Sequence, residues 1–140
     1  MKEIHNEVAY IWLNRPEKKN AMDFDIWFGI PALIKEINDN EEAKCILLLG
    51  KGDSFSAGID IATFMGDMSL NENLSSTTDD RRKTMKVIDD MQTAFTVIAN
   101  SKIPVIALAH GFCLGGATSM ISACDIRLST KDAKFSIGET

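Results

Sequence analysis

Apolar residues along the chain fall into two patterns, short continuous runs and longer stretches with helical spacing. The runs at residues 8–13, 45–49 and 105–109 are bounded by turn-forming residues and predict buried strands, and residues 125–129 predict another short strand. Residues 81–99 have apolar positions three and four apart, which predicts an amphipathic helix. Those positions are Met85, Ile88, Met91, Phe95 and Ile98. Alternating strands and helices indicate an α/β fold with helices covering the strands.

Another helix is predicted after Asp23, a residue type that suits the N-cap position. Its apolar side is formed by Phe24, Trp27, Ile34 and Ile37. Gly29 and Pro31 interrupt this pattern, which predicts a kink or two short helices. Residues 38–40 close the element. The polar residues 67–80 predict a surface loop that could serve as a lid, with Thr77 and Asp80 resembling a capping box.

Two segments of small residues stand where predicted strands end. Residues 54–61 read Ser-Phe-Ser-Ala-Gly-Ile-Asp-Ile, and residues 110–116 read His-Gly-Phe-Cys-Leu-Gly-Gly before a small-residue stretch that predicts a helix. Backbone amides at a strand-to-helix corner lack acceptors and favour an anion. Gly115 and Gly116 lack a Cβ, so a ligand can approach the main chain. An oxyanion site is one interpretation, and a tight turn without a ligand is the other.

Composition narrows the classes of function that need to be considered. The 140 residues suit one domain, residues 1–140, and 45% apolar residues suffice for a core. A net charge of −5 without a basic stripe argues against nucleic-acid binding. No apolar run is long enough to span a membrane, and we do not expect residues 1–5 to begin a signal peptide, because no apolar region follows them. Cys45, Cys113 and Cys124 have no metal-ligand spacing, so we expect reduced thiols in an intracellular protein and no metal site.

Several motifs together resemble the enoyl-CoA hydratase/isomerase (crotonase) superfamily. They are Asn-Arg-Pro at 14–16 with Asn-Ala-Met at 20–22, Phe-Ser-Ala-Gly-Ile-Asp-Ile at 55–61, Pro-Val-Ile-Ala at 104–107 with the glycine corner at 110–116, and Ser-Ala-Cys-Asp-Ile-Arg at 122–127. The resemblance covers essentially all 140 residues. It implies a crotonase-like spiral of ββα units. Since family members are nearly twice this length, it also implies truncation before their C-terminal helical region.

The same resemblance implies a site for an acyl-CoA thioester. By position, the amides of Ala57 and Gly116 supply the oxyanion hole, and Glu139 supplies the catalytic carboxylate. The implied substrate-binding residues are Gly58, Asp60, Gly115, Ser119, Lys18 and Lys19. The two lysines are candidate contacts for the coenzyme A phosphates, and solvated surface lysines are the alternative interpretation.

Ser119 and Glu139 bear on which reaction is possible. Hydratases of the family resemble one another in using two glutamates, and Ser119 stands at the first of those positions. One carboxylate suffices for a double-bond isomerase, which favours isomerisation over hydration. The residues around Asp125 also resemble dienoyl-CoA isomerases, but those enzymes carry an aspartate where Ser119 stands, and its absence weakens an assignment to them. A non-catalytic or truncated acyl-CoA-binding module is the alternative function.

Two other functions fit the residues poorly. Residues 111–116 do not fit Gly-x-Gly-x-x-Gly, which argues against dinucleotide binding. Ser119 is not in Gly-x-Ser-x-Gly context, which argues against a serine hydrolase. We therefore expect acyl-CoA as the partner, with coenzyme A as part of the substrate and no separate cofactor. We also expect a homo-oligomer, a trimer or hexamer, in the full-length form, located in the cytoplasm, with mitochondria or peroxisomes as alternatives.

Overall fold

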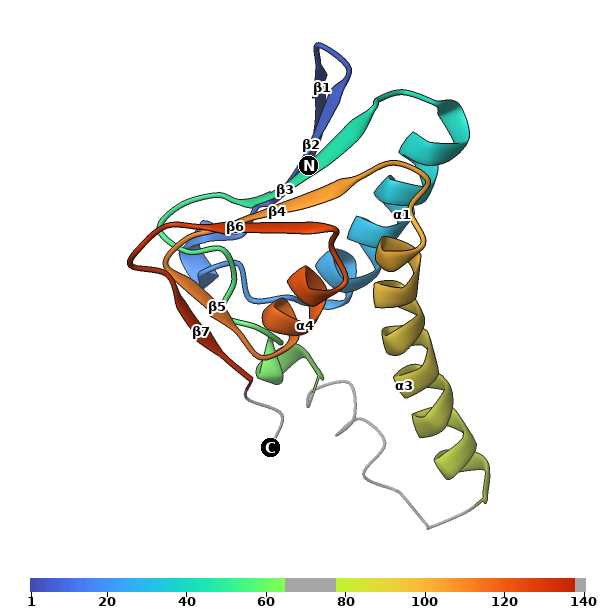
Figure 1. Cartoon of the computed structure of the whole chain (residues 1–140). Helices are drawn as coiled ribbons and strands as arrows, with labels where there is room; N and C mark the ends of the chain where they lie inside the picture. The colour runs from blue at the N-terminus through green and yellow to red at the C-terminus, as the bar shows by residue number, and fades with distance from the viewer. Residues whose placement is uncertain (65–77, 138–140) are drawn as a thin grey trace.

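The structure, a computed structural model, describes residues 1–64 and 78–137, with the backbone alone described at 78–84, 87 and 88. Its larger sheet has five strands in the order β1-β2-β3-β4-β6 (Figure 1). The β1–β2 pair is antiparallel, and the other neighbours are parallel. The bounds of these strands are β1 Lys2–His5, β2 Val8–Leu13, β3 Cys45–Gly50, β4 Val105–Ala109 and β6 Ile126–Ser129.

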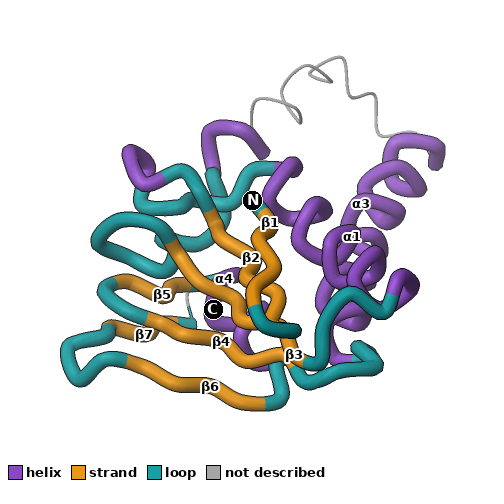
Figure 2. Tube along the Cα trace, turned by 90° about the horizontal axis from the view of Figure 1, so that it is seen from above, coloured by secondary structure: helices purple, strands orange, loops and turns teal. Residues whose placement is uncertain are grey.

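A second, smaller sheet pairs β5 (Phe112–Leu114) with β7 (Lys134–Ser136) in parallel. The chain passes from β4 of the larger sheet to β5 and then into helix α4 (Gly116–Ser122), and from β6 to β7. Figure 2 shows the two sheets on one side of the molecule and the long helices on the other. Strand, strand and helix therefore follow one another as a spiral, which confirms the expected fold class.

Helix α1 (Phe24–Asn40) begins at the predicted cap, since the Asp23 carboxylate accepts a hydrogen bond from the Ile26 N–H at 2.9 Å. The alternative of two short helices is wrong, because Pro31 lies inside one continuous helix. Pro31 is buried, as are its helix neighbours Ile30 and Ile34. This packing offsets the roughly 3 kcal/mol that an interior proline costs a helix.

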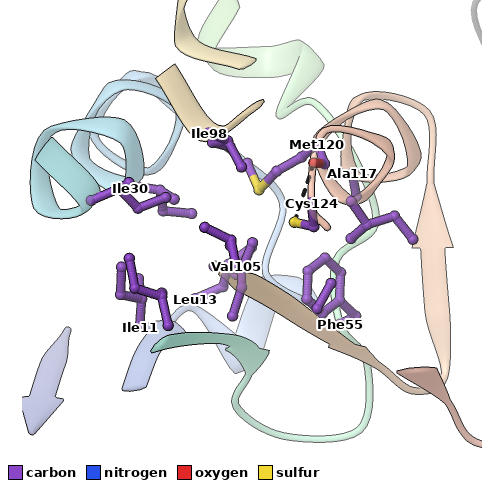
Figure 3. Close-up of a cluster of buried hydrophobic side chains, with 14 of the residues drawn as sticks. Ile11, Leu13, Ile30, Phe55, Ile98, Val105, Ala117, Met120 and Cys124 are labelled. Atoms are coloured by element: carbon purple, nitrogen blue, oxygen red, sulfur yellow. Dashed lines mark hydrogen bonds between the residues drawn. The ribbon is translucent and has the colours of Figure 1, made fainter. Parts of the chain in front are cut away.

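The core lies between the larger sheet and the helices. Alternate residues of β2, β3 and β4 are buried, as expected of strands with one face on a core. Figure 3 shows side chains from β2, α1, α3 (Thr78–Ala99) and α4 meeting there, with the Cys124 thiol 3.7 Å from the Met120 carbonyl oxygen. Ile98 of α3 is buried as predicted, whereas Met85 is 59% exposed. The N-terminal end of α3 extends beyond the rest of the molecule in Figure 1, which explains the exposure of Met85.

Three short strands were not predicted as strands from the sequence. β1 is a polar edge strand, and β5 and β7 have three residues each. Hydrophobic periodicity is weak in such short segments. The predicted lid at residues 67–80 lies largely outside the described residues, and so does Thr77 of the proposed capping box.

Candidate oxyanion site

The two glycine-containing corners lie side by side in parallel register. The Ser56 N–H donates to the Phe112 carbonyl oxygen at 2.9 Å, and the Leu114 N–H donates to the Ser56 carbonyl oxygen at 3.1 Å. Ser56 thereby pairs with Cys113. Beyond this pair the backbones approach so closely that a Cβ on Gly58 would lie 2.6 Å from the Leu114 carbonyl oxygen. Main-chain hydrogen bonds thus hold together two segments that are 57 residues apart in sequence.

Each corner turns at a glycine in a conformation that other residues rarely adopt. Gly58 has a φ of 93° and Gly115 a φ of 51°. Positive φ carries little penalty for glycine because it has no Cβ. Ile59 follows the turn in one corner, and Gly116 follows the turn in the other. The peptide N–H of each therefore lies just after the glycine at which the chain turns.

The Ile59 and Gly116 amides belong to the two adjacent corners, each three residues beyond the paired residues Ser56 and Cys113 respectively. Among the described residues, neither N–H has a hydrogen-bond acceptor. Gly116 is the first residue of α4, where no intrahelical acceptor exists. Ile59 is held on both sides, since Met22 donates to the Gly58 carbonyl oxygen at 2.7 Å and accepts from the Asp60 N–H at 2.9 Å.

This geometry corrects the prediction for Ala57. The Ala57 N–H donates to the Lys19 carbonyl oxygen at 2.9 Å and is therefore not available to a ligand. The unbonded amide of this corner belongs to Ile59, two residues later. A sequence signal existed, because Ile59 follows Gly58 as Gly116 follows Gly115.

Asn20 positions the segment that packs on both corners, a role that sequence reasoning missed. It is fully buried, and its side-chain amide donates to the carbonyl oxygens of Lys51 at 2.7 Å and Ser54 at 2.8 Å. Its side-chain oxygen accepts from the Arg15 N–H at 2.8 Å, and its own carbonyl oxygen accepts from the Ser56 hydroxyl at 2.8 Å. Asn20 has a φ of 54°, a conformation that asparagine tolerates better than most residues. The sequence signal for this role was the Lys19-Asn20 pair in a turn-prone loop.

Asp60, predicted to contact substrate, is engaged within the protein. Its carboxylate is 7% exposed and lies 3.1 Å from the Arg15 guanidinium and 3.7 Å from the Lys18 ammonium. It also accepts from the Thr63 N–H at 3.3 Å. Burial opposes ionisation of Asp60, but the hydrogen bonds from Thr63 and Arg15 and the Lys18 charge outweigh it and lower the pKa. Asp60 therefore fixes the first corner to the Arg15 loop.

The two predicted phosphate-contacting lysines have different surroundings. The side chain of Lys18 is 56% exposed and faces Asp60. Lys19 is also exposed, and its ammonium lies over the Phe112 ring, 4.7 Å from the ring centroid. Both lysines belong to the loop between β2 and α1, so both lie near the first corner.

The two residues expected to select the reaction are differently placed. Ser119 is half-buried on α4, and its N–H donates to the Gly115 carbonyl oxygen at 3.2 Å. Glu139 lies outside the described residues. The segment before it ends beside the second corner, where the Ser136 carbonyl oxygen accepts from the Gly115 N–H at 2.8 Å.

The nucleophilic side chains near the site are unsuited to catalysis. Burial raises the pKa of Cys113 to about 11 and that of Cys124 to about 12, so both thiols remain protonated near neutral pH. A ring nitrogen of His110 lies 2.9 Å from the Gly52 carbonyl oxygen, in keeping with a structural role. Within residues 1–64 and 78–137, no group of three potential metal ligands occurs. No helix in that part of the chain is long and apolar enough to cross a membrane.

Comparison with known proteins places this chain in a family. The sequence model of the enoyl-CoA hydratase/isomerase family matches residues 3–140, so the chain belongs to that family. It is 36% identical to a peroxisomal Delta(3,5)-Delta(2,4)-dienoyl-CoA isomerase of Arabidopsis thaliana, over 99% of this chain and 50% of the relative. It is 32% identical to a crotonyl-CoA hydratase of Syntrophomonas wolfei, over 95% of this chain and 47% of the relative.

Solved structures agree with the sequence relatives. An enoyl-CoA hydratase/isomerase family protein from Hyphomonas neptunium superposes with a TM-score of 0.79 at 35% identity, covering 99% of this chain and 49% of that one. An enoyl-CoA hydratase from Mycobacterium smegmatis gives a TM-score of 0.81 at 27% identity, covering 96% of this chain and 47% of that one. The chain thus spans half or less of the length of these relatives.

Proposed function

We propose that the protein containing this chain binds acyl-CoA thioesters through the paired Ile59 and Gly116 amides and acts through an enolate. The observation that carries this proposal is the pair of unbonded N–H groups, one in each of two adjacent corners. Two donors fixed in advance stabilise a developing oxyanion better than water, which must reorient. The names of the relatives, which act on enoyl-CoA compounds, support the same substrate class.

Among reactions of such an enolate, we favour double-bond isomerisation. Glu139 would remove a proton from carbon 2 of a 3-enoyl thioester, with the electron pair held as the enolate at the amide pair. The same carboxyl group would then return the proton to carbon 4, leaving a conjugated 2-enoyl thioester and an unchanged enzyme. Hydration also needs a second group to handle water, and Ser119 has no useful basicity for that work.

The relatives include six dienoyl-CoA isomerases as well as the crotonyl-CoA hydratase. Their names favour an isomerase, whereas Ser119 departs from the aspartate expected of the dienoyl enzymes. One specific observation supports an alternative function. If Ser119 marks loss of proton transfer, the domain binds acyl-CoA without turning it over.

The experiment that tests the isomerase is the Glu139→Gln variant of the full protein. Removing the base while keeping the shape should lower isomerisation by about 10²–10⁴-fold and leave acyl-CoA affinity within a few-fold. Absorbance of the conjugated thioester follows isomerase and hydratase directions in separate assays. Ser119→Glu is the matched gain-of-function variant and should introduce measurable hydration. Efficient hydration by the unmodified protein would contradict the isomerase, and binding without any turnover would favour the alternative.

An assembly and a location for the full protein follow from the same family membership. We propose a homo-oligomer, a trimer or hexamer, for the full protein, because the family resemblance implies one. Coenzyme A enters as part of the substrate, so no separate cofactor is proposed. We propose the cytoplasm as the location, with peroxisomes or mitochondria as alternatives, because a relative from Arabidopsis thaliana is named as peroxisomal and one from Mus musculus as mitochondrial.

A further inference from the structure

One arginine side chain joins the loop after β2 to the start of helix α1 and to the first corner. The Arg15 guanidinium donates to the Ala21 carbonyl oxygen at 2.8 Å and lies 3.0 Å from the Asp23 carboxylate. Its other terminal nitrogen donates to the Asp60 carboxylate at 3.1 Å. A guanidinium carries its N–H donors in a rigid planar fork, so these contacts fix the relative positions of the segments that accept them.

The accepting residues flank the two residues that meet at the first amide of the oxyanion site. Ala21 and Asp23 stand on either side of Met22, and Asp60 directly follows Ile59. Met22 and Ile59 are paired in parallel as an isolated bridge. The guanidinium therefore holds both members of this backbone pair through their chain neighbours.

The Met22 side chain extends this connection to the second corner. Met22 is fully buried, and a Cβ added to Gly116 would lie 3.1 Å from its Cε atom. The same Cβ would lie 2.8 Å from the Trp27 ring of helix α1. Met22 thus pairs with the residue that carries one unbonded N–H, Ile59, and packs against the residue that carries the other.

The two carboxylates that face Arg15 make its position specific. Asp60 is 7% exposed, and Asp23 uses one oxygen for Arg15 and the other to cap α1 through the Ile26 N–H. Removing one partner of a buried ion pair leaves an uncompensated charge, so these carboxylates need a cation. A lysine ammonium is a point charge on a flexible stem and cannot reproduce the planar fork that spans them.

We propose that Arg15 is a positioning residue for the oxyanion site, which holds the Ile59 N–H in place relative to the Gly116 N–H. It acts through Asp60 and through the segment around Met22. This inference rests on the proposed function, which assigns the amide pair to the thioester oxygen. Preorganised donors lose their effect when they are displaced. The contribution of Arg15 should therefore appear in turnover and in polarisation of the bound carbonyl more than in affinity.

The test measures how strongly the site polarises the thioester carbonyl. A saturated acyl-CoA with an isotopically labelled carbonyl is bound to the full protein, and the carbonyl stretching frequency is followed by infrared difference spectroscopy. Hydrogen bonds from both amides should lower this frequency on binding. Arg15→Lys keeps the charge but not the fork, so most of the frequency shift should be lost. Its kcat for isomerisation should fall about 10–100-fold, with KM within about threefold of the native value.

Lys2→Gln is the matched control, because it breaks a similar bridge elsewhere in the molecule. The Lys2 ammonium lies 2.7 Å from both Glu36 and Glu42, and its side chain is 22% exposed, as is that of Arg15. This variant should keep the native carbonyl shift and kcat. Asp60→Asn is a second test variant should Arg15→Lys fail to fold. It keeps the shape of the side chain, weakens one contact of the fork and should lose part of the carbonyl shift.

The outcomes separate this inference from the function on which it rests. A native carbonyl shift in folded Arg15→Lys overturns the positioning role, even if kcat falls, since the amides would then be in place. An equal loss in Lys2→Gln also overturns it, because the effect would be one of general stability. If the unmodified protein does not bind the acyl-CoA, or binds it without any carbonyl shift, the proposed function fails instead.

Discussion

Replacing Gly58 with alanine tests whether the close approach of the two corners sets the position of the Ile59 amide. The new Cβ would lie 2.6 Å from the Leu114 carbonyl oxygen, whereas ordinary contact begins at 3.4 Å, so the corners must separate by about 0.8 Å. The φ of 93° adds about 1–2 kcal/mol of backbone strain. Misplacement by roughly 1 Å can cost an enzyme about a hundredfold in rate. We therefore expect kcat for isomerisation to fall about 10²-fold, with a smaller change in KM.

The assay is the absorbance of the conjugated thioester, with the melting temperature measured in parallel. Gly29→Ala is the matched control, because its Cβ meets no atom within 4 Å and the position is inside helix α1. That variant should gain about 0.5–1 kcal/mol of stability and keep its kcat. Gly115→Ala tests the effect of backbone strain without a steric clash. The φ of Gly115 is positive, but the added Cβ would meet no atom within 4 Å. Native kcat in a folded Gly58→Ala protein would refute the reasoning about the corners.

Two further predictions concern buried groups. Asn20→Asp removes the hydrogen bonds to the Lys51 and Ser54 carbonyl oxygens and places a charge against them, so the free energy of unfolding in urea should fall by about 3 kcal/mol; a loss below 1 kcal/mol would contradict the positioning role of Asn20. At pH 8 only about one Cys113 thiol in 10³ is ionised, because burial raises its pKa to about 11, and Cys124 is ionised still less. A disulfide reagent should therefore modify half-buried Cys45 first and the other two only on unfolding, and equal rates for all three thiols would show that the core is open.

The features that the sequence predicted well depend on local patterns. Asp23 caps its helix because its side chain reaches an amide three residues away, and residues 45–49 form a strand because they are continuously apolar. The continuity of α1 through Pro31 was missed, since the packing that offsets the cost of proline is tertiary. The choice between Ala57 and Ile59 was missed for a related reason. Which amide remains unbonded depends on the Lys19 carbonyl, 38 residues away in the chain.

The Lys19 and Lys134 ammonium groups over the Phe112 ring show the same limit of prediction from local sequence. The three residues form no sequence motif, because they come from the loop after β2, from β7 and from β5 respectively. Only the parallel pairing of β5 with β7 brings Lys134 opposite Phe112. By contrast, Gly115 and Gly116 are adjacent in the sequence, so both could be predicted from one continuous segment. The structure places both at the second corner.

The use of peptide N–H groups at both corners has a consequence for the pH–rate profile. Peptide amides neither gain nor lose a proton over the range in which proteins stay folded, so the proposed oxyanion stabilisation by Ile59 and Gly116 should be the same in acid and in base. A carboxylate that moves the substrate proton does titrate. Activity should therefore fall in acid as that one carboxylate becomes protonated. This inflection of the pH–rate profile should disappear when Glu139 is replaced by glutamine. The shape of the profile thus reports the proton-transfer group alone, undisturbed by the groups that hold the thioester oxygen.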